Sequence, residues 1–73
     1  MEPWREAFKL NMRKTREEKG IKVVDLADEM GVTIAMIYRW ESLANTRIPS
    51  VTHVRNICKY LGVTSDYLLF GEE

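Results

Sequence analysis

The chain has 73 residues, with eleven Lys and Arg against eleven Asp and Glu and a single cysteine, Cys58. This length is typical of one small domain, and one cysteine excludes a disulfide framework or a zinc site built from cysteines. No stretch has the ~18 consecutive apolar residues of a membrane helix, and no apolar run near the N-terminus indicates a signal peptide. We therefore expect a single domain over residues 1–73, in the cytoplasm.

A net charge of zero counts against nucleic-acid binding, because such proteins usually carry a basic excess. The charges are unevenly distributed, however. Residues 1–22 carry seven basic and four acidic side chains, whereas residues 23–47 carry two basic and four acidic ones. A basic first segment can still give the molecule one positive face.

The first predicted helix begins near Pro3, which suits a first helical turn, and ends near Lys19, before Gly20. Apolar residues recur every four positions and are expected to face inward; they are Trp4, Phe8 and Met12, followed by Thr15. The basic residues of this helix are expected to point mostly outward; they are Arg5, Lys9, Arg13, Lys14 and Lys19.

Two further short helices are predicted on either side of Gly31. The first covers about residues 23–30, and Gly31 tolerates the left-handed conformation that ends a helix. Thr33 can cap the second, which covers about residues 33–43 and places Ile37 and Trp40 on one face. Two short helices joined by a tight turn with glycine form a helix-turn-helix unit, whose second helix can lie in a DNA major groove.

The longest predicted loop follows, from Ser42 to Ser50, and Asn45 is expected to be a helix C-cap. Ser50 is expected to cap a helix over about residues 51–61, and Thr64 a last short helix over 65–70. No strand pattern occurs, so the sequence predicts an all-α fold of five short helices.

Five segments in this order resemble the lambda-repressor-type helix-turn-helix domain of phage repressors, Cro-like proteins and related bacterial regulators. They read REEKG from Arg16, then DLADEMGV, IYRWE, IPS and LGVTSDYLL, and the resemblance covers roughly residues 8–70. The resemblance implies a compact five-helix bundle with the third helix as recognition helix. It also implies binding of double-stranded DNA, as a homodimer, by a transcriptional regulator such as a repressor of a phage or bacterium.

The resemblance also assigns roles by position. It implies a structural ion pair between Arg16 and Glu41. Positions that contact bases in the family fall on Thr33, Ile34, Ala35, Tyr38 and Arg39. Positions that contact phosphates fall on Lys22, Ser42 and Asn45, with Arg13 as an additional phosphate contact.

The chain departs from the family pattern in the residues that contact DNA. Lys22 and Val23 stand where the family has a Ser or Thr cap followed by Gln, and Leu43 stands where a glycine is common. Ile34 can pack on thymine methyl groups, as can the alanine that follows it, and Arg39 can bind guanine through two hydrogen bonds.

These departures leave a second interpretation open. Val23, Val24 and Ile34 would form an exposed apolar patch, and such patches more often bind proteins than DNA. The chain would then be an antirepressor or modulator that binds a partner regulator through this face. Tyr60 and Phe70 are candidate contacts in a homodimer.

Nothing in the sequence favours an enzyme. His53 and Cys58 are five residues apart in one predicted helix, which does not place them on the same face. No metal site, cofactor or small-molecule substrate is expected, and His53 is interpreted as a surface residue.

Overall fold

The computed structural model describes residues 2–71. Within this range it contains helices and no strands, which confirms the predicted all-α fold. The helices are α1 (Pro3–Glu18), α2 (Val23–Met30), α3 (Ile34–Glu41), α4 (Val51–Leu61) and α5 (Ser65–Phe70).

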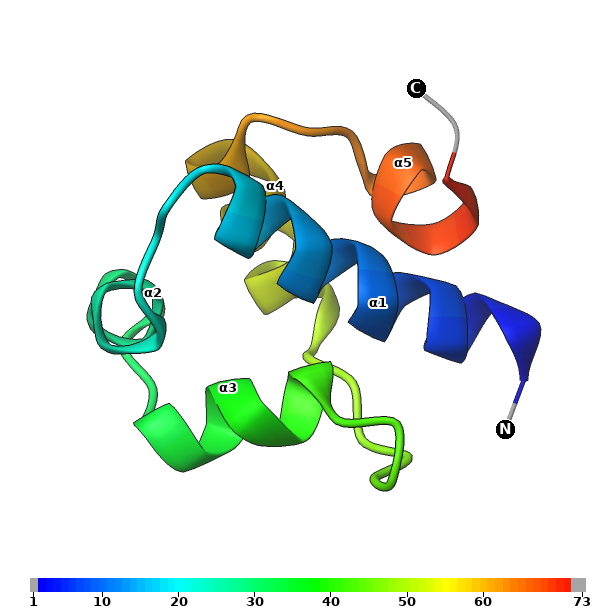
Figure 1. Cartoon of the computed structure of the whole chain (residues 1–73), viewed down its shortest axis with the longest axis horizontal. Coiled ribbons are helices and arrows are strands. Elements are labelled where there is room, and N and C mark those ends of the chain that lie inside the picture. Colours follow the sequence, from blue (N-terminus) through cyan, green and yellow to red (C-terminus); the bar gives the residue numbers. More distant parts are fainter. Residues whose placement is uncertain (1, 72–73) are drawn as a thin grey trace.

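The longest helix, α1, crosses the front of the bundle (Figure 1), and both α5 and α3 pack against it. Helix α2 contacts α3 and α4, and α4 also contacts α5. The space between the helices is filled by a buried apolar core, made of Phe8, Met12, Leu26, Ala27, Met30, Ile37, Trp40, Ile57, Leu61 and Leu68. All five helices contribute to this core, which leaves the opposite face of α3 at the lower edge of the bundle.

Local capping explains why α3, α4 and α5 begin where the sequence predicts. The hydroxyls of Thr33, Ser50 and Thr64 each accept a hydrogen bond from the backbone N–H three residues later. The turn between α2 and α3 contains Gly31 at φ 68°, a left-handed backbone conformation that residues other than glycine rarely adopt. Helices as short as α2 and α3, with eight residues each, need these caps and the core to be stable.

Helix α3 is shorter than predicted, because it ends at Glu41 and not near residue 43. Ser42 is extended (φ −92°, ψ 127°), and its hydroxyl accepts from the backbone N–H of Ala44 at 3.2 Å. Asn45 is therefore not a helix C-cap; its Oδ1 accepts from the N–H of Arg47 at 2.8 Å. These hydrogen bonds from side chains to the backbone compete with the backbone hydrogen bonds of a helix. Helix α3 therefore ends before the end that the sequence predicts.

Lys9 does not point outward as the sequence predicts: it is fully buried. Its Nζ donates to the carbonyl oxygens of Arg39 at 2.8 Å, Trp40 at 3.4 Å and Arg47 at 2.5 Å. The last carbonyls of a helix have no partner within the helix and attract cations, which explains the inward direction of this lysine.

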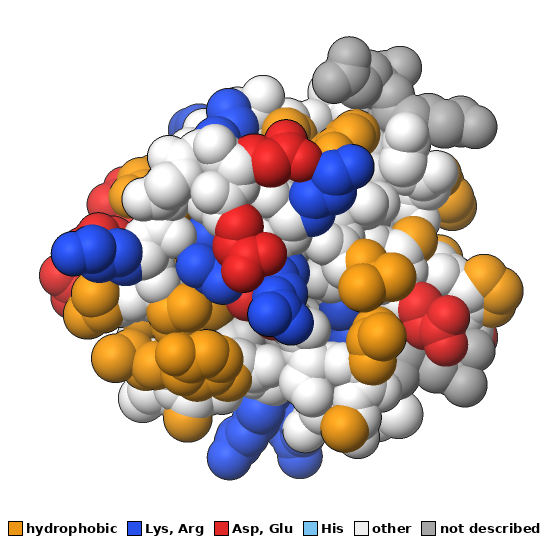
Figure 2. Space-filling view, viewed as in Figure 1, with side chains coloured by type: hydrophobic (Ala, Val, Ile, Leu, Met, Phe, Trp, Pro, Cys, Tyr) orange, Lys and Arg blue, Asp and Glu red, His pale blue; other side chains and the backbone are white. Residues whose placement is uncertain are grey.

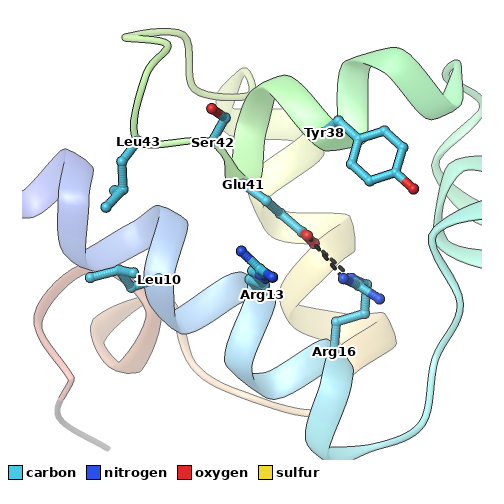
Figure 3. Close-up of a pocket in the computed structure, with 7 residues that line it drawn as sticks. All are labelled: Leu10, Arg13, Arg16, Tyr38, Glu41, Ser42 and Leu43. Atoms are coloured by element: carbon cyan, nitrogen blue, oxygen red, sulfur yellow. Dashed lines mark hydrogen bonds and ion pairs between the residues drawn. The ribbon is translucent and has the colours of Figure 1, made fainter.

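Arg16 and Glu41 form the ion pair that the resemblance implied (Figure 3). Arg16 donates from Nε to Oε2 of Glu41 at 2.8 Å and from Nη2 to Oε1 at 3.1 Å, and Nη1 donates to the carbonyl of Ile21 at 2.9 Å. The side chains are only 11% and 5% exposed. The hydrogen bond to Glu41 is the main reason that the pKa of Arg16 is raised above its ordinary value. This pair ties the end of α3 to the end of α1.

Replacing Arg16 with Met is expected to leave the Glu41 carboxylate buried without its partner. Breaking such a pair costs about 3–5 kcal/mol, a large part of the stability of so small a domain. The double variant Arg16→Met/Glu41→Leu should regain much of that loss, because no unpaired charge remains. Urea unfolding followed by circular dichroism measures both effects; a single variant as stable as the original chain would contradict the role given to this pair.

Candidate nucleic-acid interface

The outer face of α3 is formed by the residues that do not contribute to the core. Ile37, Trp40 and Glu41 are buried, whereas Tyr38 and Arg39 between them are exposed. Adjacent helical residues lie about 100° apart, so Tyr38 and Arg39 project toward different sides of this face. The helix therefore presents a short ridge of exposed side chains to solvent, made of Ile34, Ala35, Tyr38 and Arg39.

The five residues expected to contact bases all belong to this ridge or to its start. Each is exposed; they are Thr33, Ile34, Ala35, Tyr38 and Arg39. The Thr33 hydroxyl already accepts from the N–H of Met36 at 3.2 Å, so it acts first as a helix cap. Tyr38 is 59% and Ile34 43% exposed, which makes them the largest apolar surfaces of the ridge.

The four residues expected to contact phosphates are placed around α3 without forming one cluster. Lys22 is exposed at the start of α2, and Arg13 is exposed on α1, 3.6 Å from the Glu17 carboxylate. An ion pair this exposed is weak, so Arg13 remains available to an anion. Ser42 and Asn45 are half-buried, and their side-chain oxygens already accept bonds within the loop.

A groove runs along one side of the ridge, between α1 and α3 (Figure 3). We call it the Tyr38 groove; it is lined by Leu10, Arg13, Arg16, Tyr38, Glu41, Ser42 and Leu43. Leu10 and Leu43 face each other at one end, and Tyr38 lies at the other, beyond the Arg16–Glu41 pair. Since that pair neutralises itself, Arg13, whose exposed pair with Glu17 is weak, supplies the charge of this groove that can bind an anion.

A second groove follows the other side of the ridge, and sequence reasoning missed two of its residues. We call it the arginine groove; it is lined by Arg5, Met36, Arg39, Trp40, Thr46, Arg47, Ile48, Pro49, Ser50 and His53. Arg5 and Arg47 were not predicted as site residues, and they are separated by 41 other positions in the sequence. No local pattern relates them; α1 and the loop after α3 bring them together.

The arginine groove is positive, although Arg5 Nε also lies 3.6 Å from the Glu2 carboxylate in a partly exposed ion pair. Three guanidinium groups line it and no carboxylate does. Arg5 is held in place, because its Nη1 donates to the carbonyl of Thr46 at 3.2 Å and its guanidinium lies 4.6 Å from the centre of the Trp4 ring. Ser50, which caps α4, lines the same groove, and the N-terminus of α4 adds partial positive charge there. The groove is therefore suited to an anionic group such as a phosphate.

The apolar patch predicted on α2 and α3 is smaller than expected. Val24 is 49% and Ile34 43% exposed, but Val23 is half-buried and packs against the core. Val23 lies in the first turn of α2 on the side that carries Leu26 and Ala27 into the core, so it is not free for a partner. Figure 2 shows hydrophobic side chains over α2 and the start of α3, with basic side chains projecting below α3.

The two candidate dimer contacts lie on different elements. Tyr60 is 38% exposed and lines a depression with Glu29 and Met30 of α2, whereas Phe70 is 62% exposed on α5. Their exposure leaves both available, and their role in a dimer stays a prediction.

Residues 2–71 contain no group of three or more His, Cys, Asp and Glu side chains able to hold a metal ion. His53 is half-buried, and its ring lies 5.3 Å from that of Trp40. None of the helices described over these residues combines the length and the apolar character that a membrane-spanning helix requires.

The helix-turn-helix family matches residues 12–68, which is most of the chain. This match, the two helices around Gly31 and the all-helical bundle define the class: the chain belongs to the XRE-type helix-turn-helix family. It is also similar to YqaE of Bacillus subtilis (strain 168), described as an uncharacterized HTH-type transcriptional regulator, with 34% identity over 65 residues. That alignment covers 89% of this chain and 54% of YqaE, so the chain spans about half the length of this relative.

The hydroxyl of Thr33 is expected to stabilise α3 whether or not it contacts a ligand. Thr33→Ala should lower the free energy of unfolding by about 1 kcal/mol, and Thr33→Ser, which keeps the hydroxyl, by much less. Thermal unfolding of both variants measures the difference. Equal stabilities of the Ala and Ser variants would mean that the cap contributes nothing, and that the hydroxyl is free to bind elsewhere.

Proposed function

We propose that this chain is a transcriptional regulator that binds double-stranded DNA in a sequence-specific manner, with α3 in the major groove. The observation that carries the proposal is the exposed ridge of α3 beside the arginine groove. Side chains that can contact base edges thus lie next to a cluster of cations that can contact phosphates. Membership of the helix-turn-helix family supports this assignment, as does the similarity to a protein described as a transcriptional regulator.

In this proposal the ridge contacts bases. Arg39 binds guanine through its guanidinium group, and Ile34 and Ala35 pack on thymine methyl groups. Tyr38, with more than half of its surface exposed, adds contact area and a hydroxyl. Thr33, whose hydroxyl caps α3, contributes through its methyl group.

The phosphates on the two sides of the major groove are held by different sets of residues. On the arginine-groove side they contact Arg5, Arg47 and the N-terminus of α4. On the other side they contact Arg13 and Lys22, and the loop after α3 contributes Ser42 and Asn45.

We also propose that the chain binds as a homodimer to two half-sites about one helical turn of DNA apart, as helix-turn-helix dimers do. Tyr60 and Phe70 are the exposed aromatic residues available for such a contact. As the resemblance implies, we place such a regulator, with repression as its expected action, in the cytoplasm of a bacterium, or of a host infected by a phage.

Selection from a random pool of duplex DNA is expected to yield a palindromic motif. Arg39→Ala should remove the preference at one base pair, at a cost of about 1–3 kcal/mol, whereas Arg47→Ala should weaken all sequences alike and lower the salt slope by about 1. The matched control is Arg55→Ala, which removes the same charge from an exposed position on α4, outside both grooves. If folded protein selects no motif, or if Arg55→Ala weakens binding as much as Arg39→Ala, the proposed interface is wrong.

A specific observation favours a second function, which is binding of a partner regulator protein by an antirepressor or modulator. Val24 and Ile34 are exposed and apolar, and Val24 shares α2 with the exposed acidic residues Asp25 and Asp28, which would repel DNA. In this interpretation α2 and the start of α3 form the interface.

Ile34→Asp distinguishes the two functions when it is compared with Val51→Asp. Val51 is 87% exposed on α4, so the same change there controls for added charge. In the partner interpretation Ile34→Asp abolishes complex formation in a pull-down with a regulator from the same cell, and Arg39→Ala has little effect. In the DNA interpretation Arg39→Ala has the larger effect, on DNA binding. If neither variant changed DNA binding or partner binding, the binding surface would lie outside the face that both proposals use.

A further inference from the structure

The buried ammonium group of Lys9 joins two parts of the chain that flank the loop after α3. Its three acceptors are the carbonyl oxygens of Arg39 and Trp40, in the last turn of α3, and of Arg47, near the end of the loop. One nitrogen within hydrogen-bond distance of all three acceptors holds the beginning and the end of this loop together.

Arg5 acts on the same segment, one helical turn before Lys9 on α1. It donates to the carbonyl of Thr46, which directly precedes the carbonyl bound by Lys9. The backbone N–H of Arg47 is in turn bound by Asn45 Oδ1 at 2.8 Å. The backbone of Arg47 is thus held by its N–H from within the loop and by its carbonyl from α1.

The two arginines whose carbonyls bind Lys9 are also the two that bring charge to the arginine groove from α3 and the loop. We propose that Lys9 is a positioning residue for DNA binding, which fixes Arg39 and Arg47 on one groove without touching DNA itself. This inference rests on the proposed function, in which the arginine groove faces the phosphates. Lys9 is inaccessible to solvent, so its own charge cannot contact a phosphate directly.

The chemistry of the site fits a positioning role. An ammonium group has three donors and no acceptor, which matches three carbonyl oxygens with no N–H group left over. Burial lowers the pKa of Lys9, and the charge of Arg5 lowers it further. An apolar residue here would leave the carbonyls without this donor and the ends of the loop unconnected.

The first arm of the test needs no DNA. In the whole chain, Lys9→Met should increase the hydrogen exchange of amides in residues 42–48 about tenfold or more, while amides of the core residues Ile57 and Leu61 keep their protection. Lys14→Met is the matched control, because it removes a lysine of α1 whose side chain is 66% exposed. If Lys9→Met does not fold, Lys9→Gln, which retains two donors, is measured in its place. Unchanged exchange in residues 42–48 would overturn the proposal.

The second arm measures binding of the selected duplex at several salt concentrations. Lys9→Met should weaken binding about tenfold and lower the salt slope by about 1, as the loss of one phosphate contact does, although Lys9 is buried. In the Arg47→Ala background, Lys9→Met should weaken binding by clearly less than tenfold, because only the positioning of Arg39 is then still lost. Lys14→Met should leave binding unchanged.

The outcomes separate the two proposals. If the chain binds the duplex and the effects of Lys9→Met and Arg47→Ala multiply independently, Lys9 contributes only general stability and the positioning role is overturned. If the unaltered chain selects no DNA, the proposed function fails. The exchange measurement then decides alone whether Lys9 orders the loop.

Discussion

Two buried cations of α1 hold the end of α3 in place, and the rest of the structure depends on them. Arg16 binds the carboxylate of Glu41, and Lys9 binds carbonyls of the last turn of α3 and of the following loop. Burying a charge is costly unless it is well paired, so these bonds permit little variation in where α3 lies. Helix α1 is thus the scaffold on which the exposed ridge of α3 is oriented.

This support matters because α3 is short. Eight residues make about two helical turns, which are not stable in isolation, so the ridge is only as rigid as the groups beneath it. Trp40 and Ile37 anchor it from the core, and Thr33 caps its start. Residues that never reach the surface therefore decide how the exposed ones are presented.

The charge distribution explains how a chain with no net charge can present a site for an anion. The arginine groove gathers Arg5, Arg39 and Arg47, with no carboxylate in its lining. Acidic residues are placed elsewhere; those of α2 are Asp25, Asp28 and Glu29. Long-range attraction for DNA should be modest, because the acids offset it at a distance, while the local field in the groove remains positive.

The sequence by itself determined where most helices begin and end. The bounds of α2, α4 and α5 agree with the prediction, because they are set by local chemistry: hydroxyl caps at Ser50 and Thr64, and glycines after each helix. The pairing of Arg16 with Glu41 followed from family resemblance, since no spacing within the chain specifies a bond between two helices. Only the tertiary structure decided that Lys9 is buried, that α3 ends at Glu41 and that Arg5 and Arg47 line the same groove. Each of these features depends on the path of the loop after α3 over α1. The periodicity of a helix cannot predict which backbone carbonyls of a distant segment lack a hydrogen-bond partner.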